Sequence, residues 1–300
     1  MDRRGLLHGL LAYSLWGFVP LFWKLLEGVA PVEVLAHRVV WGCAVFVAFT
    51  RAMGIGAEVR RAAQDRSVLG AMALSGALIA INWGVFVGAV ATGHLLDASL
   101  GYFINPLVSV ALGTVVLRER LRPLQRLSIL LAAIGVTLIA WSAGQMPWIS
   151  LVLAGSFGLY GLVRKIARVE SLVGSTIETA LLAPIAAGYL VYLAASGQGA
   201  LGHAPAATEA LLIATGLVTA GPLLLFTSAA RRLPLSTVGF LQYLTPTGHF
   251  LIAVAAFGEP LAEGRLAAFG FIWLGLGVFS IDLWRAAQAR RVAGGPPARR

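Results

Sequence analysis

The sequence contains a single cysteine, Cys43, which lies within an apolar run. A disulfide framework and a metal site built from cysteines are therefore both excluded. Charge is also scarce, because only 12% of the residues are charged while 58% are hydrophobic, and the mean hydropathy is +0.83. Soluble domains carry roughly 25% charged and about 45–50% apolar residues, so this composition indicates an integral membrane protein.

The chain also lacks the common sequence motifs of nucleotide and hydrolytic chemistry. Its two lysines, Lys24 and Lys165, do not follow glycine, so there is no Walker A loop, and neither HExxH nor GxSxG occurs. An intrinsic ATP-driven pump is therefore excluded. We expect no enzymatic activity, no cofactor and no bound metal.

Apolar segments of transmembrane length make up most of the chain. A spanning helix needs about 20 mainly apolar residues, and ten such segments occur, joined mostly by short loops. We expect an all-α integral membrane protein with spans at 6–24, 32–51, 68–91, 98–117, 125–142, 147–165, 173–193, 210–230, 236–257 and 266–285. The first span is too long for a signal-peptide core, and no small-residue cleavage site follows it, so we expect it to be retained.

The basic residues orient these spans. The chain has 23 lysines and arginines and a formal net charge of +10. With a cytoplasmic N-terminus and alternating spans, all but three of these residues fall in cytoplasmic segments, the exceptions being Lys24, Arg38 and Arg265. The positive-inside rule predicts this asymmetry, so the charge reports topology rather than nucleic-acid binding. Both termini are expected in the cytoplasm, with residues 287–300 forming a disordered basic tail.

The two halves of the chain are similar in sequence. An offset of 140 residues pairs Pro106 with Pro246, and an offset of 141 pairs Gly17 with Gly158. We therefore expect two five-helix repeats, at 1–142 and 146–286. Because five is odd, the second repeat starts on the opposite side of the membrane, and the two are inverted. Inverted repeats with prolines at matching positions are typical of secondary transporters, which bind substrate near the midplane.

Several stretches of the chain resemble a known family. They are "AHR", "INWGVF", "ASLGYFINPL", "SFGLYGLVRK", "STVGFLQYLTPT" and "GFIWLGLGVFSID", and they extend over roughly residues 9–282. As a set they resemble the RarD-type branch of the drug/metabolite transporter superfamily, whose members contain EamA domains. The resemblance implies ten helices in two inverted repeats, a bacterial inner-membrane location, and export of metabolites or drugs by alternating access. The name of the branch refers to chloramphenicol sensitivity.

Two residues depart from the pattern of that family. Asp97 stands where glutamate is common, and His249 stands where a bulky apolar residue is expected. Histidine titrates in a range that suits proton coupling. An isolated histidine in a span more often hydrogen-bonds a neighbouring helix, and this is what we expect of His249.

The candidate substrate site lies at the two proline positions. Proline removes a backbone donor and frees the carbonyl of the preceding turn, which is tolerated where the backbone lines a cavity. We predict helix breaks at Pro106 and Pro246, with both prolines facing a central cavity. The polar residues expected to bind substrate there are Tyr102, Asn105, Gln242 and Tyr243.

Aromatic residues are also candidates for lining this cavity. Four tryptophans lie well inside their spans, at Trp16, Trp41, Trp83 and Trp273, and four suit the membrane interfaces, at Trp23, Trp141, Trp148 and Trp284. Trp16 and Trp83 are predicted to contact substrate, because a deep tryptophan offers an apolar face and one hydrogen bond. Simple packing is the alternative for each of them.

Ionisable residues within the spans are functional candidates, because a charge at the membrane centre costs about 2.5–3.5 kcal/mol unless it is paired. Arg38 suits a bidentate contact with a substrate carboxylate or phosphate. A structural ion pair with Glu33 or Asp97 is the alternative. Glu178, Glu33 and His37 are the candidates for proton coupling, and a structural role is the alternative for them.

The leading prediction is a secondary exporter of small amphipathic metabolites or drugs, either amino-acid-like or chloramphenicol-like. Its partners are a small-molecule substrate and the lipid bilayer, with protons as a candidate coupling ion. A membrane-embedded enzyme is one alternative, and a channel or scaffold without active transport is another.

Overall fold

The computed structural model describes residues 2–92, 94–142, 148–255 and 265–293. These residues form helices and connecting turns, and they contain no strand. In chain order the helices are α1 (Arg3–Lys24), α2 (Pro31–Ala52), α3 (Gly56–Gln64), α4 (Arg66–Ala91), α5 (Leu95–Val115), α6 (Pro123–Ser142), α7 (Trp148–Ile166), α8 (Ser171–Ser196), α9 (Ala206–Arg232), α10 (Leu235–Gln242), α11 (Leu244–Ala255) and α12 (Arg265–Ala293). The prediction of an all-α protein is confirmed.

Nine helices in the described ranges are long and apolar enough to cross a membrane. They are α1, α2, α4, α5, α6, α7, α8, α9 and α12, and each overlaps one predicted span. The remaining predicted span, 236–257, corresponds to α10 followed directly by α11. The short helix α3 was not predicted, because it is polar and buries none of its residues.

Proline accounts for the break between α10 and α11. Pro246 has no N–H to donate to the carbonyl of Gln242, four residues earlier. The N–H of Tyr243 turns back instead to the carbonyl of Phe240 at 3.2 Å, and α10 ends there. This is the break predicted at Pro246.

The second predicted break is wrong, because α5 continues through Pro106 from Leu95 to Val115. Pro106 withdraws a single backbone hydrogen bond from a helix of 21 residues. The regular turns on both sides are sufficient to carry the helix through, as happens in many transmembrane helices.

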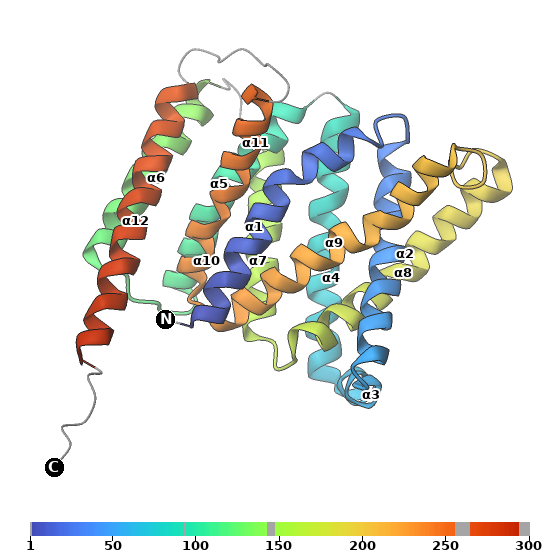
Figure 1. The fold of residues 1–300 in the computed structure, drawn as a ribbon, viewed down its shortest axis with the longest axis horizontal. Coiled ribbons are helices and arrows are strands. Elements are labelled where there is room, and N and C mark those ends of the chain that lie inside the picture. Colours follow the sequence, from blue (N-terminus) through green and yellow to red (C-terminus); the bar gives the residue numbers. More distant parts are fainter. Residues whose placement is uncertain (1, 93, 143–147, 256–264, 294–300) are drawn as a thin grey trace.

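Contacts between helices repeat when the two halves are exchanged. α1 packs against α9 and α11, and its counterpart α7 packs against α4 and α5. α2 packs against α9, as α8 packs against α4. Counterparts also pair directly, α2 with α8, α5 with α10, and α6 with α12 at one edge of the bundle (Figure 1). This is the contact pattern of two five-helix units related by a two-fold axis.

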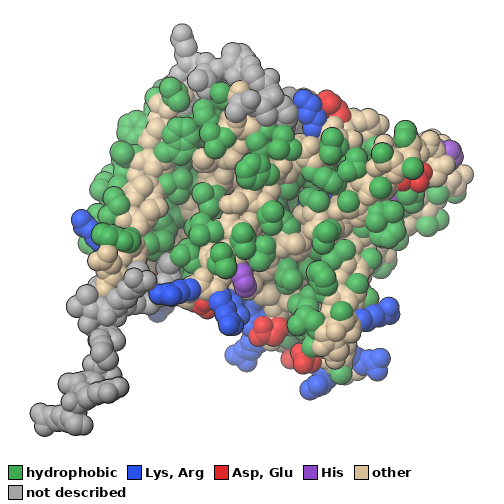
Figure 2. All heavy atoms as spheres, viewed as in Figure 1, with side chains coloured by type: hydrophobic (Ala, Val, Ile, Leu, Met, Phe, Trp, Pro, Cys, Tyr) green, Lys and Arg blue, Asp and Glu red, His purple; other side chains and the backbone are tan. Residues whose placement is uncertain are grey.

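The ends of the bundle differ in charge. α1 begins and α12 ends at the same end, whereas α7 runs in the direction opposite to α1 (Figure 1). Lysine and arginine side chains gather at the end where α1 begins and α12 ends (Figure 2). We call this the basic end and the other the far end. The distribution agrees with the asymmetry on which the predicted topology depends.

The last helix is longer than expected. α12 runs to Ala293, so the disordered tail predicted from residue 287 does not begin there. Residues 286–293 read AAQARRVA, which is rich in strong helix formers. Residues 294–300 lie outside the described part of the chain.

Candidate functional site

A cavity of about 530 Å³ lies between the two halves of the molecule. Its lining comes from α1, α2, α4 and α5 of the first half and from α7, α9, α10 and α11 of the second. On α1 the lining begins at Tyr13 and ends at Trp23, so the cavity occupies the half of the bundle nearer the far end. A volume of this size accommodates a small organic molecule.

Most of the predicted substrate-binding residues line this one cavity. They are Trp16, Arg38, Trp83, Tyr102, Asn105 and Gln242. Tyr243 does not line it and is only 1% exposed, packed in an apolar cluster with Phe103 and Phe240. Consecutive residues of a helix point about 100° apart, so a helix that turns Gln242 toward the cavity turns Tyr243 away. The structure therefore does not bring Tyr243 to the cavity with the other candidates.

The prolines themselves also lie outside the lining. The residues before them, Asn105 and Thr245, do contribute to it. Pro106 and Pro246 were predicted to face the cavity. The residues that line it are instead the ones immediately before them.

Arg38 is held in place by three helices of the bundle. The Cζ atom of its guanidinium lies 4.6 Å from the ring centroid of Trp83 and 5.0 Å from that of Trp23. Its Nε donates a hydrogen bond to Thr219 Oγ1 at 3.1 Å. Tryptophan faces attract a guanidinium through the ring quadrupole. These contacts therefore stabilise the positive charge of Arg38, although none of them is with a carboxylate.

The alternative ion pair between Arg38 and Glu33 is not formed, and the side chain of Asp97, the other alternative partner, lies outside the described part of the chain. Glu33 is 3% exposed, and its Oε1 accepts the backbone N–H of Ala200 at 2.6 Å. The same oxygen lies 3.8 Å from His37 Nε2, and His37 Nδ1 accepts the indole N–H of Trp41 at 3.1 Å. Glu33 thus fastens α2 to the segment that joins α8 and α9, His37 contacts residues of α2 itself, and neither lines the cavity.

Tyr13, Asn105 and Gln242 form what we call the floor of the cavity, its part nearest the basic end. Tyr13 is 2% and Asn105 is 8% exposed. Among the described residues, Tyr13 Oη and Asn105 Oδ1 have no hydrogen-bond partner, whereas Gln242 Oε1 accepts from Ser109 Oγ at 3.2 Å. Buried polar atoms are nearly always paired in proteins, so two unpaired atoms at this position are unusual.

The walls of the cavity are largely aromatic. Trp16 and Phe157, which the repeat aligns, meet edge-to-face with centroids 5.8 Å apart. Tyr102 and His249 form a similar contact at 5.8 Å, and His249 Nε2 lies 3.2 Å from the Trp16 carbonyl oxygen. His249 therefore bonds a neighbouring helix, as expected, but it also lines the cavity, which was not predicted.

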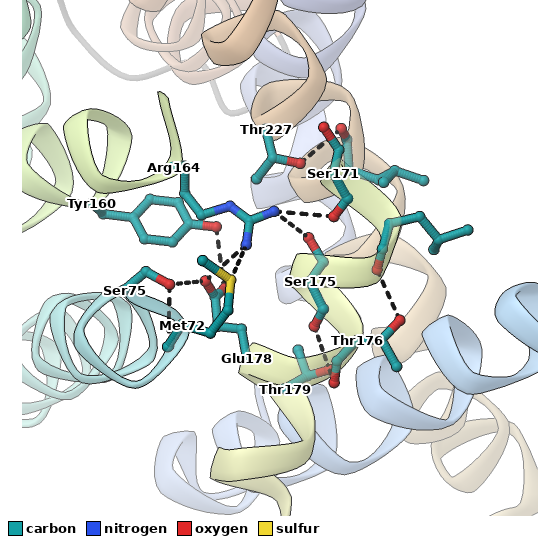
Figure 3. A network of polar contacts seen from close by, with 12 residues as sticks. Met72, Ser75, Tyr160, Arg164, Ser171, Ser175, Thr176, Glu178, Thr179 and Thr227 are labelled. Carbon is teal, nitrogen blue, oxygen red and sulfur yellow. Dashed lines mark hydrogen bonds and ion pairs between the residues drawn. The ribbon is translucent and has the colours of Figure 1, made fainter. Parts of the chain in front are cut away.

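Glu178 lies outside the cavity, in a buried ion pair with Arg164. The two side chains are 0% and 1% exposed, and Arg164 Nη1 is 3.5 Å from Glu178 Oε2. Ser75 and Tyr160 donate their hydroxyl hydrogens to the same carboxylate, Tyr160 at 3.2 Å (Figure 3). The carboxylate is thus surrounded by donors from α4 and α7.

The guanidinium of Arg164 is bound on its other side by α8. Its Nη2 donates to the Ser171 carbonyl at 3.0 Å and to Ser175 Oγ at 3.2 Å, while Nη1 contacts Met72 Sδ at 2.9 Å (Figure 3). Arg164 had been assigned by charge to the surface at the basic end. It instead closes a polar network that joins α4, α7 and α8.

Apolar packing fills the bundle between the cavity and the basic end. Leu233, Leu235 and Val238 belong to one buried cluster there, together with Leu162 and Leu241. Contacts of this kind leave no space for a molecule the size of the cavity.

Glu119 adds a polar link between the halves at the basic end. Its carboxylate accepts the N–H groups of Leu235 at 2.6 Å and Ser236 at 2.9 Å, and the Ser236 hydroxyl at 2.7 Å. A residue of the first half thus caps the N-terminus of α10 in the second, where a negative charge is favourable.

Three further cavity residues were not recognised in the sequence. Trp23 was assigned to a membrane interface, although it stacks on Arg38. Asn82 donates to the Leu153 carbonyl at 2.8 Å and to Ser156 Oγ at 3.0 Å, and its amide within an apolar helix was a usable signal. Thr219 offered no such signal, because threonine is common in transmembrane helices.

Comparison with known proteins identifies relatives over nearly the whole chain. Residues 3–141 match the model of the EamA-like transporter family. An uncharacterized transporter of Pseudomonas aeruginosa is 49% identical over 292 residues, which cover 95% of this chain and 96% of that protein. Protein RarD of Escherichia coli is 44% identical over 93% of this chain and 95% of its own. The chloramphenicol-sensitive protein RarD of Pseudomonas aeruginosa is 33% identical, over 97% and 99%.

A solved crystal structure has a similar fold. It superposes with a TM-score of 0.68 and covers 91% of this chain and 96% of its own, at 20% sequence identity. At that identity the similarity concerns the fold alone.

Proposed function

Because the chain belongs to the RarD-type branch of the EamA-like transporter family, and is thus a multi-pass membrane transporter, we propose that it exports small amphipathic metabolites or drugs by alternating access. Amino-acid-like and chloramphenicol-like compounds are the proposed substrates. The observation that carries the proposal is the cavity between the halves, where Arg38, Asn105 and Gln242 lie among aromatic side chains.

The arrangement of the halves supports alternating access. The cavity lies toward the far end, while apolar packing and the Glu119 cap occupy the basic end. Helix contacts repeat when the halves are exchanged. If each half adopts the conformation of the other, the cavity moves to the basic end and the far end closes, as in other inverted-repeat carriers.

The charge distribution supports an orientation in the membrane. We propose that the basic end faces the cytoplasm, as the positive-inside rule requires, and that both termini lie there. The relatives with these names come from bacteria, which supports the inner membrane as the location. The cavity as described then faces outward.

The driving force is proposed to be a gradient of protons or of the substrate itself. Glu178, Glu33 and His37 were the candidates for carrying protons, but none of them lines the cavity. Glu178 and Glu33 join separate segments of the chain and His37 contacts Glu33 and Trp41 on its own helix, which favours a structural role over proton transfer. His249 is the titratable imidazole that does face the cavity.

Transport by the purified protein in proteoliposomes tests the proposal. A panel of amino acids and aromatic antibiotics should include compounds whose uptake is saturable and accelerated by unlabelled compound on the opposite side. A channel gives flux without such counterflow, and a membrane enzyme changes the compound rather than moving it. The absence of saturable movement across the whole panel, with and without a pH gradient, contradicts the proposed function.

A further inference from the structure

We propose that the cavity recognises an organic oxyanion, a carboxylate or phosphate carried on a planar apolar body, and that Arg38 selects the negative charge. The inference rests on the proposed transport function, and among small amphipathic metabolites it favours anionic compounds over the zwitterionic amino-acid-like and neutral chloramphenicol-like ones named there. It predicts that neutral and zwitterionic compounds of the same shape are poorer ligands.

The contacts of Arg38 fix the position of its guanidinium but leave hydrogen-bond donors of that group unused. Trp23 and Trp83 fix its plane, and Thr219 accepts from Nε. Neither terminal nitrogen donates a hydrogen bond to any of the described residues. Two parallel N–H groups in a fixed plane match the two oxygens of a carboxylate or phosphate, and a preoriented donor pair loses little entropy on binding.

The charge balance of the lining favours an anion. Among the described lining residues Arg38 is the one permanently charged group, and no aspartate or glutamate side chain is among them. An entering carboxylate neutralises Arg38 in a partly dehydrated space. An ammonium group finds no carboxylate among the described lining residues to offset its loss of water, so amines and zwitterions are disfavoured.

The rest of the lining describes the body of the ligand. Trp16, Phe86 and Phe157 supply flat apolar surfaces, which suit an aromatic ring. At the floor, the lining residues Tyr13, Asn105 and Gln242 are polar and uncharged. The cavity thus combines one ionic contact with an aromatic enclosure and a neutral polar contact.

Binding of a matched series of small probes to the full chain in detergent tests the inference. The series consists of 3-phenylpropionate, phenyl phosphate, 3-phenylpropanamide, phenethylamine and phenylalanine. Isothermal titration calorimetry measures the affinity of each. At least one of the two oxyanions should bind roughly tenfold to a hundredfold more tightly than the amide, the amine and the amino acid, because hydrogen bonds to charged groups are the strong ones. The oxyanion that binds more tightly shows whether the cavity prefers a carboxylate or a phosphate.

Variants assign the preference to Arg38. Arg38→Gln should bring the affinity for the oxyanion down to that for the amide, and Arg38→Lys should retain a preference for the oxyanion of reduced size, because the bidentate contact is lost while the charge stays. Arg51→Gln removes a positive charge from the exposed end of α2 and should change nothing. Asp97→Asn serves as a second control, and the preference should survive it. Size-exclusion profiles show which variants are folded.

The outcomes separate recognition from transport. Equal binding of oxyanion and amide, preference for phenylalanine, absence of binding by every probe, or an unchanged preference in a folded Arg38→Gln protein overturns the inference. Saturable transport of neutral compounds together with any of these results leaves the proposed function standing. Anion-selective binding without transport of any probe upholds the recognition and contradicts the carrier.

Discussion

Replacing Glu178 with glutamine should destabilise the protein and leave the response of transport to an imposed pH gradient unchanged. The Arg164 and Glu178 side chains are 1% and 0% exposed. Glutamine keeps an acceptor for Ser75 and Tyr160, but it leaves the guanidinium as an uncompensated buried charge. Breaking a buried ion pair in this way costs about 3–5 kcal/mol, and the retained hydrogen bonds place the expected loss near the lower value.

Thermal unfolding in detergent measures this loss. For a chain of this size about 3 kcal/mol corresponds to a decrease in the midpoint on the order of 5–10 °C. Glu170→Gln is the matched control, because Glu170 pairs with Arg231 at 3.3 Å with 76% of its side chain exposed, and such pairs contribute about 0–1 kcal/mol. The double replacement of Arg164 by Met and Glu178 by Leu should recover most of the lost stability, since no unpaired charge remains.

The reasoning is refuted if Glu178→Gln unfolds at the temperature of the parent protein and transport no longer responds to an imposed pH gradient. Glu178 then carries the proton, and its ion pair with Arg164 belongs to one state of the transport cycle. If stability falls and the response to pH is retained, the pair is structural.

Two further changes test the packing between the halves. Glu119→Ala leaves the N–H groups at the start of α10 without their acceptor and should cost about 1–3 kcal/mol of stability, whereas Glu58→Ala on exposed α3 should cost less than about 0.5 kcal/mol, both followed by thermal unfolding. Gly216→Ala places a Cβ 2.5 Å from the backbone carbon of Trp41 and should lose about 1–3 kcal/mol, while Gly221→Ala on the same helix meets open space and should gain about 0.4–1 kcal/mol. Equal midpoints within either pair contradict the packing described.

Much of the fold follows from patterns that depend on the membrane alone. Length and hydropathy locate the spans because every crossing helix meets the same apolar slab. Pro246 predicts a real break because a missing N–H is a local property. Pro106 shows the limit of that argument, since whether a helix ends at a proline depends on the packing around it.

The candidate site was predictable in place but not in detail. The repeat brought Trp16 and Phe157 into register, and both line the cavity. Which of two adjacent residues faces inward depends on the rotation of the helix, and this is why Gln242 lines the cavity and Tyr243 does not. The partners of Arg38 come from three helices far apart in sequence, so only the fold reveals them.

Access to the floor of the cavity from the two faces of the membrane tests alternating access most directly. In a chain with Cys43 replaced by serine, Asn105→Cys provides a single thiol at the floor, beyond which apolar packing occupies the basic end. Membrane-impermeant maleimides are applied to oriented vesicles from either side. We predict that the thiol is modified from both faces while the vesicles stay sealed to the reagent. Modification from the far face alone, under every condition that supports transport, contradicts a cavity that opens alternately to both sides.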